Sequence, residues 1–242
     1  MDVTVVVPTY NEAASFPLVA EALLALPVPG LRLLDVDDDS PDGTGRVADE
    51  WAAKSAGRVA VLHRRGARGL GRAYLDGFRW ALANGADAIV QMDADLSHPP
   101  ADVPRLLERL TTCDVAVGSR YTAGGTIDDR WGRGRLALSR SANAYARTLL
   151  GLKTRDATAG FKAWRRSALE AVDLARIRSN GYLFQVEMAY VCERLGLRIE
   201  EVPIRFAERR AGRSKMSLKV KLEAAAGIVG VWRRHHGIRP LG

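Results

Sequence analysis

Short strand-like runs alternate with helical patterns along the first 120 residues, and this alternation restricts the fold more than any other feature of the chain. Apolar, β-branched runs predict five strands, at residues 3–8, 31–36, 59–63, 88–92 and 114–118. Amphipathic stretches predict the intervening helices, at about residues 12–26, 45–55, 70–84 and 100–110. Strands separated by helices form parallel sheets with right-handed crossovers. We therefore expect an α/β fold that binds ligands at the carboxyl ends of its strands.

The second half of the chain has a different pattern. Helical periodicity covers residues 136–150 and 182–195, a late strand is predicted at 199–206, and Ser214 is placed to cap a last amphipathic helix. One stripe of that helix is apolar, formed by Leu218, Leu222, Ala225, Val229 and Trp232. Either the domain itself or a membrane surface could cover this stripe. No repeat and no flexible linker divides the chain, so we expect a single domain.

Charge is distributed unevenly along the chain. Residues 1–120 hold 12 basic and 17 acidic side chains, whereas residues 121–242 hold 24 basic and 11 acidic ones, a net charge of −5 against +13. A uniformly basic nucleic-acid-binding protein would not divide in this way. The acidic half suggests a metal or polarised site, and the basic half suggests phosphate groups or an anionic membrane. Ordinary variation of the surface is the alternative explanation.

Cysteine usage and hydropathy exclude several classes. Cys113 and Cys192 lie far apart without a C-x-x-C pattern, which argues against a disulfide framework and a thiolate zinc site. The N-terminal residues carry an acid where a signal peptide has bases. The longest apolar run in the rest of the chain, residues 224–232, is about half of the ~20 residues that a bilayer crossing needs. We expect a protein of a reducing compartment that spans no membrane.

The most informative segment follows the fourth predicted strand. Asp93 and Asp95 stand two positions apart at the end of an apolar run, so both carboxylates can turn toward one point. Oxygen ligands suit Mg²⁺ or Mn²⁺, and Mg²⁺ often takes one or two protein carboxylates together with substrate phosphates. This D-x-D pattern predicts a clamp for a metal and a diphosphate. His98 could be a further ligand, but a packing role is the more common one for a histidine beside two prolines.

Polar residues also follow the first three predicted strands. Residues 8–12 form either a helix cap or a ledge for a nucleoside, with Tyr10 stacking and Glu12 accepting a hydrogen bond. Five carboxylates between residues 35 and 42 form either a solvated turn or a binding site. Residues 69–74 resemble a dinucleotide loop, but tyrosine replaces its third glycine and arginines surround it, so we expect a basic phosphate loop or a helix cap.

The basic half contains two candidate phosphate sites. Arg120 follows the fifth predicted strand, and Arg135 and Ser139 lie one helical turn apart. Arginine binds phosphate in a bidentate manner and a neighbouring hydroxyl adds a donor, although such a pair is often only a solvated surface. Residues 209–215 form a glycine-containing basic turn that has the form of a flexible flap.

Taken together, these segments resemble a known family. Nine of them occur in its order and spacing: PTYNE, DDDSPDGT, RGLGRAY, MDADLSHPP, GSRYTAGG, SRSANAYAR, DATAGFKAWRR, GYLFQVEM and EVPIRFAERRAGRSKMS. The family is that of the polyprenyl-phosphate (dolichyl-phosphate) mannosyltransferases, inverting glycosyltransferases of family 2. The resemblance runs from Val3 to about Ser217 and is greatest to the short form without C-terminal membrane helices. It implies the GT-A fold, a Rossmann-like, mixed but mostly parallel sheet flanked by helices.

The resemblance implies transfer of mannose from GDP-mannose to a polyprenyl or dolichyl monophosphate, with Mg²⁺ or Mn²⁺ as cofactor. Residues 1–120 would bind the nucleotide sugar and the metal, and residues 121–242 would bind the acceptor and include the C-terminal amphipathic helix. The implied nucleotide-sugar residues are Pro8, Tyr10, Glu12, Val36, Asp38, Asp93, Ala94, Asp95, Ser97, Arg120, Arg209 and Lys215. The implied metal ligands are Asp93 and Asp95, and the implied acceptor-phosphate residues are Arg120, Arg135 and Ser139.

Two positions depart from the family pattern. Asp39 stands where asparagine or glycine is frequent, and Ser97 stands where many members have a glutamine that can assist the metal site. Because Ser97 is shorter, a water molecule would take the place of the glutamine amide.

The implied acceptor simplifies the expected chemistry. The second pKa of a phosphate monoester is about 6, so the acceptor is largely a dianion near neutral pH. We therefore expect no essential general base, and we expect the enzyme to act by positioning and charge stabilisation through Asp95, Arg135 and Ser139.

The basic second half also suggests where the protein acts. It could bind an anionic leaflet, at roughly 1 kcal/mol for each surface cation. We expect a peripheral protein at the cytoplasmic membrane face, with no nucleic-acid partner. A membrane-anchoring protein is a further candidate partner. Two alternatives stay open: a transferase of the same fold that uses UDP-glucose or another sugar nucleotide, and a non-catalytic basic binding protein.

Overall fold

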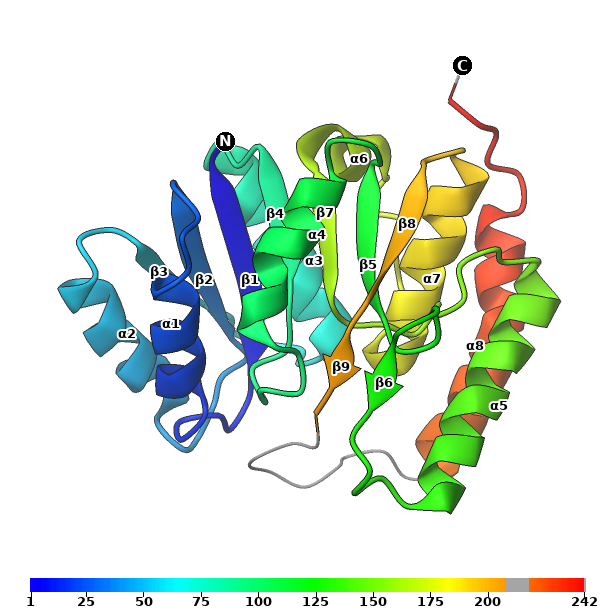
Figure 1. Cartoon of the computed structure of the whole chain (residues 1–242), viewed down its shortest axis with the longest axis horizontal. Coiled ribbons are helices and arrows are strands. Elements are labelled where there is room, and N and C mark those ends of the chain that lie inside the picture. Colours follow the sequence, from blue (N-terminus) through cyan, green and yellow to red (C-terminus); the bar gives the residue numbers. More distant parts are fainter. Residues whose placement is uncertain (208–217, 242) are drawn as a thin grey trace.

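A seven-stranded sheet with helices on both faces forms the centre of this single α/β domain (Figure 1). The computed structural model describes residues 1–207 and 218–241. The strand order is β3-β2-β1-β4-β7-β5-β8. The strands are β1 (Val3–Thr9), β2 (Leu31–Asp37), β3 (Val59–His63), β4 (Ala88–Gln91), β5 (Val115–Ser119), β7 (Lys162–Arg165) and β8 (Ile199–Pro203). The five strands predicted in the first half are confirmed to within one or two residues.

The predicted helices are also present. They are α1 (Phe16–Leu24), α2 (Thr44–Lys54), α3 (Leu70–Ala83), α4 (Val103–Arg109), α5 (Arg133–Leu150), α7 (Gly181–Arg194) and α8 (Leu218–His235). The short helix α6 (Arg166–Ala171) and the 3-10 turn η1 (Pro100–Asp102) were not separately expected. Helix α1 begins later than predicted, because the amides of Ser15 and Phe16 both donate to the Glu12 carbonyl and close a turn there. Asn11 therefore does not cap α1, and Ser214 lies outside the described residues.

Strand β7 was missed, and it is the one strand of the large sheet that runs antiparallel to its neighbours. It lies between β4 and β5, so the sheet is mixed but mostly parallel, as the resemblance implied. The predicted late strand is in fact broken after Pro203, which cannot donate to a ladder. Its second part, β9 (Arg205–Phe206), pairs instead with β6 (Thr126–Ile127) in a two-stranded sheet.

The core has three parts. One face of the sheet packs against α1, α2 and α4, and the other packs against α3, α6 and α7. A third cluster joins α5, α7 and α8, which lie side by side in Figure 1. Cys113 and Cys192 are buried free thiols.

Helix α8 has both buried and exposed apolar residues in its described part. It buries Ile228 and Val231, whereas Val229 and Trp232 are 40% and 45% exposed. None of the described helices is both long enough and apolar enough to cross a membrane.

Candidate active site

The segments that carry the predicted site residues meet at one edge of the sheet. Strands β1, β2, β4 and β5 all end at the lower edge in Figure 1. Because β7 runs the other way, the residues that precede it, 156–161, arrive at the same edge. The topology therefore places the D-x-D segment beside residues from the second half of the chain.

The end of β1 carries the residues proposed to form a nucleoside ledge. Pro8 is buried, and the ring of Tyr10 lies 4.9 Å from the guanidinium carbon of Arg68, which also donates to the Tyr10 hydroxyl at 3.0 Å. The Glu12 carboxylate accepts a hydrogen bond from the Ser15 hydroxyl at 2.5 Å. Arg68 was not among the predicted residues, and its position shows that a cation covers the proposed nucleoside ledge.

The acidic segment after β2 is held by hydrogen-bond donors. Asp38 accepts from the Gly69 amide at 2.6 Å and pairs with Arg64, and Asp39 pairs with Arg68 at 2.8 Å. Asp42 accepts from the Thr44 amide at the start of α2. Among the predicted nucleoside residues here, Asp38 lies at the edge, but the Val36 side chain is fully buried in the core. Val36 lies between β1 and β3 and is not exposed at this edge in the structure.

The glycine-rich segment before α3 is a capped helix start. The Gly71 amide donates to Asn180 Oδ1 at 2.8 Å, and Gly69 has a φ of +149°. A β-carbon at Gly69 would lie 1.9 Å from Asn180 Nδ2, which only glycine avoids. Of the two alternatives, the structure supports the helix cap, because Asp38 and Asn180 already accept from these amides.

The D-x-D carboxylates lie directly after β4. Asp93 Oδ1 accepts from the Tyr74 hydroxyl at 2.7 Å, and Asp95, 4% exposed, accepts from the Ser97 amide at 3.0 Å. Ala94 between them is buried. Burial raises the pKa of Tyr74 well above its usual value, and the Asp93 charge adds to this effect, so the phenol remains a donor.

His98 has the packing role that was considered more common. Its buried ring stacks on Phe161 with 5.2 Å between centroids, and Nδ1 lies 3.3 Å from the Asp93 amide. Burial lowers the pKa of His98, so the ring is neutral and accepts that hydrogen bond.

The residues around Asp95 fit a divalent cation of the Mg²⁺ or Mn²⁺ class. Within residues 1–207 and 218–241, no group of three or more His, Cys, Asp or Glu side chains could enclose a metal. Two carboxylates match a cation that takes its remaining oxygen ligands from a substrate diphosphate and water. The buried Ser97 hydroxyl beside Asp95 has no hydrogen-bond partner in the described part of the chain, which leaves it available for such a water.

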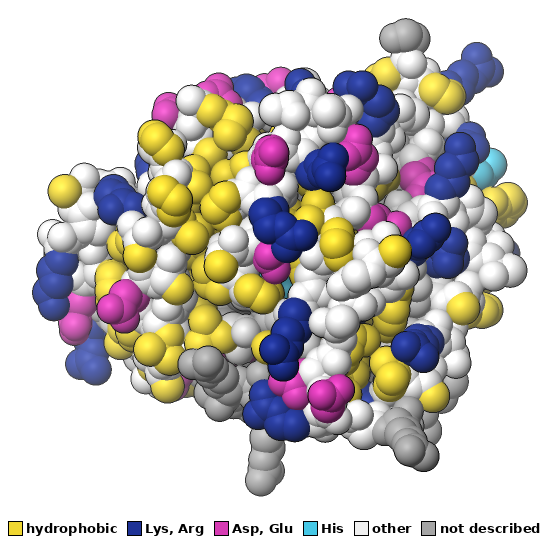
Figure 2. All heavy atoms as spheres, viewed as in Figure 1, with side chains coloured by type: hydrophobic (Ala, Val, Ile, Leu, Met, Phe, Trp, Pro, Cys, Tyr) yellow, Lys and Arg dark blue, Asp and Glu magenta, His cyan; other side chains and the backbone are white. Residues whose placement is uncertain are grey.

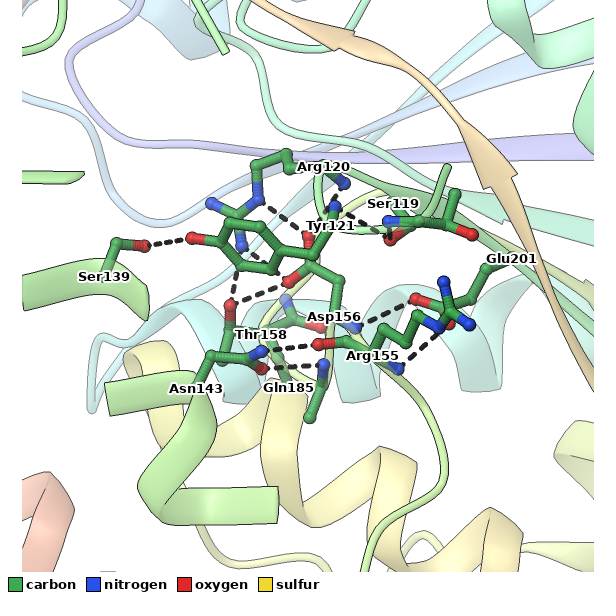
Figure 3. Close-up of polar contacts among 12 residues, drawn as sticks. Ser119, Arg120, Tyr121, Ser139, Asn143, Arg155, Asp156, Thr158, Gln185 and Glu201 are labelled. Carbon is green, nitrogen blue, oxygen red and sulfur yellow. Dashed lines mark hydrogen bonds and ion pairs between the residues drawn. The ribbon is translucent and has the colours of Figure 1, made fainter. Parts of the chain in front are cut away.

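The Arg120 guanidinium is held by a carboxylate that the sequence analysis did not identify. Its Nε and Nη2 donate to the two Asp156 oxygens at 2.8 and 2.7 Å, and Nη2 also donates to the Thr158 hydroxyl at 2.6 Å (Figure 3). Asp156 is fully buried. Burial alone would raise the pKa of Asp156, but the charge and hydrogen bonds of Arg120 lower it below its usual value. Arg120 was predicted to bind phosphate, and two of its three guanidinium nitrogens therefore already donate to protein oxygens.

Two glutamates fix the loop that carries Asp156. Glu201 of β8 accepts from the Arg155 and Asp156 amides, both at 2.9 Å. Glu193 of α7 accepts from the amides of residues 153 and 154. These side-chain contacts replace strand pairing along the loop, so Asp156 has a fixed position.

Arg135 and Ser139 both lie on α5, as predicted. The Arg135 guanidinium carbon lies 3.7 Å from the Trp131 ring centroid, and Ser139 Oγ lies 2.8 Å from the Tyr121 hydroxyl. The ring of Phe206 lies 5.6 Å from Trp131 and 5.2 Å from the Arg120 guanidinium carbon. The three predicted acceptor residues are thus linked through the rings of Trp131, Phe206 and Tyr121.

The ring of Phe206 connects these residues to the D-x-D segment. Phe206 also packs edge-on against His98, with 5.3 Å between ring centroids. Ala207 donates to the Ser97 carbonyl at 3.0 Å. The next two predicted donor-binding residues, Arg209 and Lys215, lie outside the described residues.

Comparison with known proteins identifies the family. Residues 4–173 match the family described as Glycosyl transferase family 2. The chain belongs to this family. It is therefore a glycosyltransferase, and the family expected from the sequence motifs is confirmed at this level.

Two relatives match this glycosyltransferase over most of its length. It is 47% identical over 241 residues to an undecaprenyl-phosphate mannosyltransferase of Micrococcus luteus, covering 99% of this chain and 98% of that protein. It is also 47% identical over 214 residues to a polyprenol monophosphomannose synthase of Mycolicibacterium smegmatis, covering 88% of this chain and 80% of that one.

A solved structure shares the fold of this glycosyltransferase. The glucosyl-3-phosphoglycerate synthase of Mycobacterium tuberculosis, in complex with Mn²⁺, UDP-glucose and phosphoglyceric acid, superposes with a TM-score of 0.67 and 24% identity. The superposition covers 100% of this chain and 81% of that one. The expected GT-A architecture is therefore confirmed.

Proposed function

We propose that this glycosyltransferase transfers mannose from GDP-mannose to a polyprenyl (dolichyl) monophosphate with inversion, giving polyprenyl-phosphate β-mannose as a lipid-linked sugar donor. The observation that carries the proposal is a chain of contacts from the D-x-D segment to the predicted acceptor residues. Phe206 packs against His98 of that segment and against the Arg120 guanidinium. Trp131 links Phe206 to Arg135, and Tyr121 links Arg120 to Ser139. The names of the two 47% identical relatives support mannose and a polyprenyl phosphate as the transferred group and acceptor.

The donor would bind along the edge formed by β1, β2 and β4. Pro8, Tyr10, Glu12, Val36 and Asp38 would hold the guanosine, and Asp93, Ala94, Asp95 and Ser97 would face the diphosphate. We retain Arg209 and Lys215 as groups that close over it. A Mg²⁺ or Mn²⁺ ion at Asp93 and Asp95 would supply positive charge to the GDP leaving group.

The acceptor would bind between Arg120, Arg135 and Ser139. One oxygen of its phosphate attacks the anomeric carbon as the bond from that carbon to the β-phosphate oxygen of GDP breaks, and the electron pair leaves with GDP. The attacking oxygen carries no proton at neutral pH because the second pKa of a phosphate monoester is about 6. The residues of this site therefore need to align the nucleophile and stabilise charge rather than remove a proton.

The helices beside the acceptor site suit a membrane surface. On α5, Leu138, Tyr145 and Leu149 follow one stripe and are 41%, 45% and 44% exposed. On neighbouring α8, Val229 and Trp232 are similarly exposed. Figure 2 shows basic and hydrophobic side chains interspersed on the side where α5 lies. We place the enzyme peripherally at the cytoplasmic membrane face.

Membrane attachment can be tested by flotation with vesicles that contain anionic lipid. Binding should weaken as salt is added, because surface charge contributes to it. At a given salt concentration, the double variant Leu138→Ser/Leu149→Ser should bind the vesicles more weakly than the wild type. Flotation only after addition of a second, membrane-anchored protein would contradict independent attachment and would instead support an anchoring partner.

A donor and acceptor panel tests the proposed reaction. The full chain is incubated with Mn²⁺, a polyprenyl monophosphate, and either GDP-mannose, GDP-glucose, UDP-glucose or UDP-galactose, and the sugar lipid is quantified. Product from GDP-mannose should exceed the others by at least about a hundredfold, consistent with a site that reads the base and sugar by hydrogen bonds. Preference for a UDP sugar, or for an acceptor without phosphate, would overturn the proposal.

A further inference from the structure

Tyr121 lies between two groups that the proposed function assigns to the acceptor phosphate. Its hydroxyl is 2.8 Å from Ser139 Oγ, and its ring centroid is 5.2 Å from the guanidinium carbon of Arg120. Figure 3 shows the phenol reaching from the end of β5 toward α5.

The backbone holds Tyr121 in place without help from a ligand. The amides of Tyr121 and Thr122 both donate to the hydroxyl of Ser119, at 3.2 and 3.1 Å, and Ser119 is fully buried. The adjacent Arg120 is fixed by Asp156. The turn after β5 therefore sets the direction of the phenol before any substrate arrives.

The hydrogen bond to Tyr121 restricts what the Ser139 hydroxyl can do. A serine hydroxyl has one proton and three staggered rotamers, so an isolated Ser139 would seldom point that proton at a phosphate oxygen. When the phenol donates to Ser139 Oγ, one acceptor position is used and the serine proton is directed elsewhere. A chain of two hydroxyls also polarises its terminal O–H, which strengthens a hydrogen bond to an anion.

The ring of Tyr121 also contacts a second group of the proposed acceptor site, the Arg120 guanidinium. Two nitrogens of Arg120 are committed to Asp156 and Thr158, so the guanidinium can address an anion only through its remaining edge. A ring beside the guanidinium restricts its plane through a cation–π contact. The phenol thus constrains both a hydroxyl donor and a cation.

We infer that Tyr121 is a positioning residue for the acceptor phosphate, acting through the Ser139 hydroxyl and the Arg120 guanidinium. This inference rests on the proposed function and names a residue that neither the motif comparison nor the charge pattern had assigned. The contact that distinguishes the acceptor is the one to Ser139, which is assigned to the acceptor phosphate only, whereas the D-x-D carboxylates are held by Tyr74 and the Ser97 amide.

Tyr121→Phe removes the hydroxyl and keeps the ring. The KM for polyprenyl phosphate should rise about fivefold, the usual net effect of one hydrogen bond. The KM for GDP-mannose and the thermal unfolding midpoint should stay within error, because the donor residues and the ring packing are unchanged. Tyr121→Leu, which also removes the cation–π contact, should raise the acceptor KM further. Tyr190→Phe, a buried tyrosine on α7, is the matched control and should change neither constant.

A double-mutant cycle with Ser139→Ala separates positioning from a general structural effect. If Tyr121 acts through Ser139, then Tyr121→Phe should raise the acceptor KM by less than twofold in the Ser139→Ala background. Full additivity of the two effects, an unchanged acceptor KM in Tyr121→Phe, or an equal rise in both substrate constants would overturn the inference. Wild-type enzyme that shows no mannosyl transfer would overturn the proposed function instead.

Discussion

Gly160 lies against Asp93, so closely that a β-carbon at Gly160 would be 3.1 Å from Asp93 Oδ2 and 3.2 Å from His98 Cε1. Gly160, two residues before the start of β7, therefore limits how far the first D-x-D carboxylate can turn. Because a methyl group at Gly160 would have to push the Asp93 or His98 side chain aside, we expect this contact to influence the geometry of the proposed metal and diphosphate site.

Gly160→Ala should displace the Asp93 carboxylate by a few tenths of an ångström. The Mn²⁺ concentration for half-maximal transfer should rise about tenfold, since metal affinity depends on the orientation of ligating carboxylates. A Mn²⁺ titration of activity measures this. Gly237→Ala, where a β-carbon meets nothing within 4 Å, is the control and should titrate like wild type. An unchanged titration for Gly160→Ala would show that Asp93 does not take part in metal binding.

Asp95→Ala should abolish transfer and leave the fold intact. The proposed site has two carboxylates, so loss of one removes a main ligand, and activity should fall by at least about a hundredfold. Chelator should inactivate the wild type, and added Mn²⁺ should restore it. Circular dichroism and thermal unfolding check that the variant is folded, with Asp102→Ala as a carboxylate control from the same segment. Full wild-type activity in chelator would refute the metal requirement.

Asp156→Asn should destabilise the protein, because it leaves a largely buried guanidinium without its charged partner. Breaking a buried ion pair costs about 3 kcal/mol, whereas an exposed pair contributes about 0.5 kcal/mol. Urea unfolding measures the difference, and Glu170→Gln, which breaks the exposed pair between Arg166 and Glu170, is the matched control. Equal stabilities of the two variants would contradict a structural role for the pair with Arg120.

Asp35 makes stability depend on pH in the opposite direction from most carboxylates. Burial raises its pKa to about 8 even though the Thr9 hydroxyl donates to it at 2.8 Å, which lowers the pKa. The native protein thus retains a proton there up to about pH 8, while the unfolded chain releases it near the ordinary value of 3.8. Between these values the unfolded state binds fewer protons, so the contribution of Asp35 to stability falls as pH rises.

Asp35→Asn should therefore stabilise the protein, and increasingly so toward alkaline pH. An asparagine can still accept from Thr9 but does not titrate. The difference in unfolding free energy between the variant and the wild type should grow by about 1 kcal/mol per pH unit between pH 5 and pH 8 and then level off. Urea titrations at several pH values measure it. A difference that does not change with pH would mean that Asp35 is ionised in the native state.

The elements that the sequence predicted well are those with a continuous local pattern. Strands β1 and β4 are apolar runs, and the D-x-D segment follows β4 directly. Strand β7 escaped prediction because it has only four residues and begins with Lys162, which is fully buried. Burial lowers the pKa of Lys162 to about 8, and its amine donates to Gln185 Oε1 at 2.9 Å. A strand that contains a buried lysine is therefore not recognised from the pattern of apolar residues in the sequence.

The charged groups of the candidate site were proposed from the sequence, whereas the groups that orient them were not. Arg120, Arg135 and Ser139 were identified from residue type, motif and helical spacing. Asp156 and Tyr121 were not, because their roles depend on contacts across 36 and 18 residues that only the folded sheet creates. Residue type shows which groups can bind an anion, whereas the partners that aim those groups come from tertiary structure.

The antiparallel strand β7 also determines whether the chain can be separated into two fragments that fold on their own. Strand β5 has only β7 and β8 as neighbours, and β4 has β7 on one side. When the ribosome has synthesised residues 1–120, the nascent chain therefore contains the D-x-D carboxylates and β5 but not β7, the strand that lies between β4 and β5. Such a nascent piece would expose an open edge at β4 and carry β5 without any pairing. Splitting the gene between donor and acceptor halves should give two insoluble fragments, each recoverable only by synthesis together with the other.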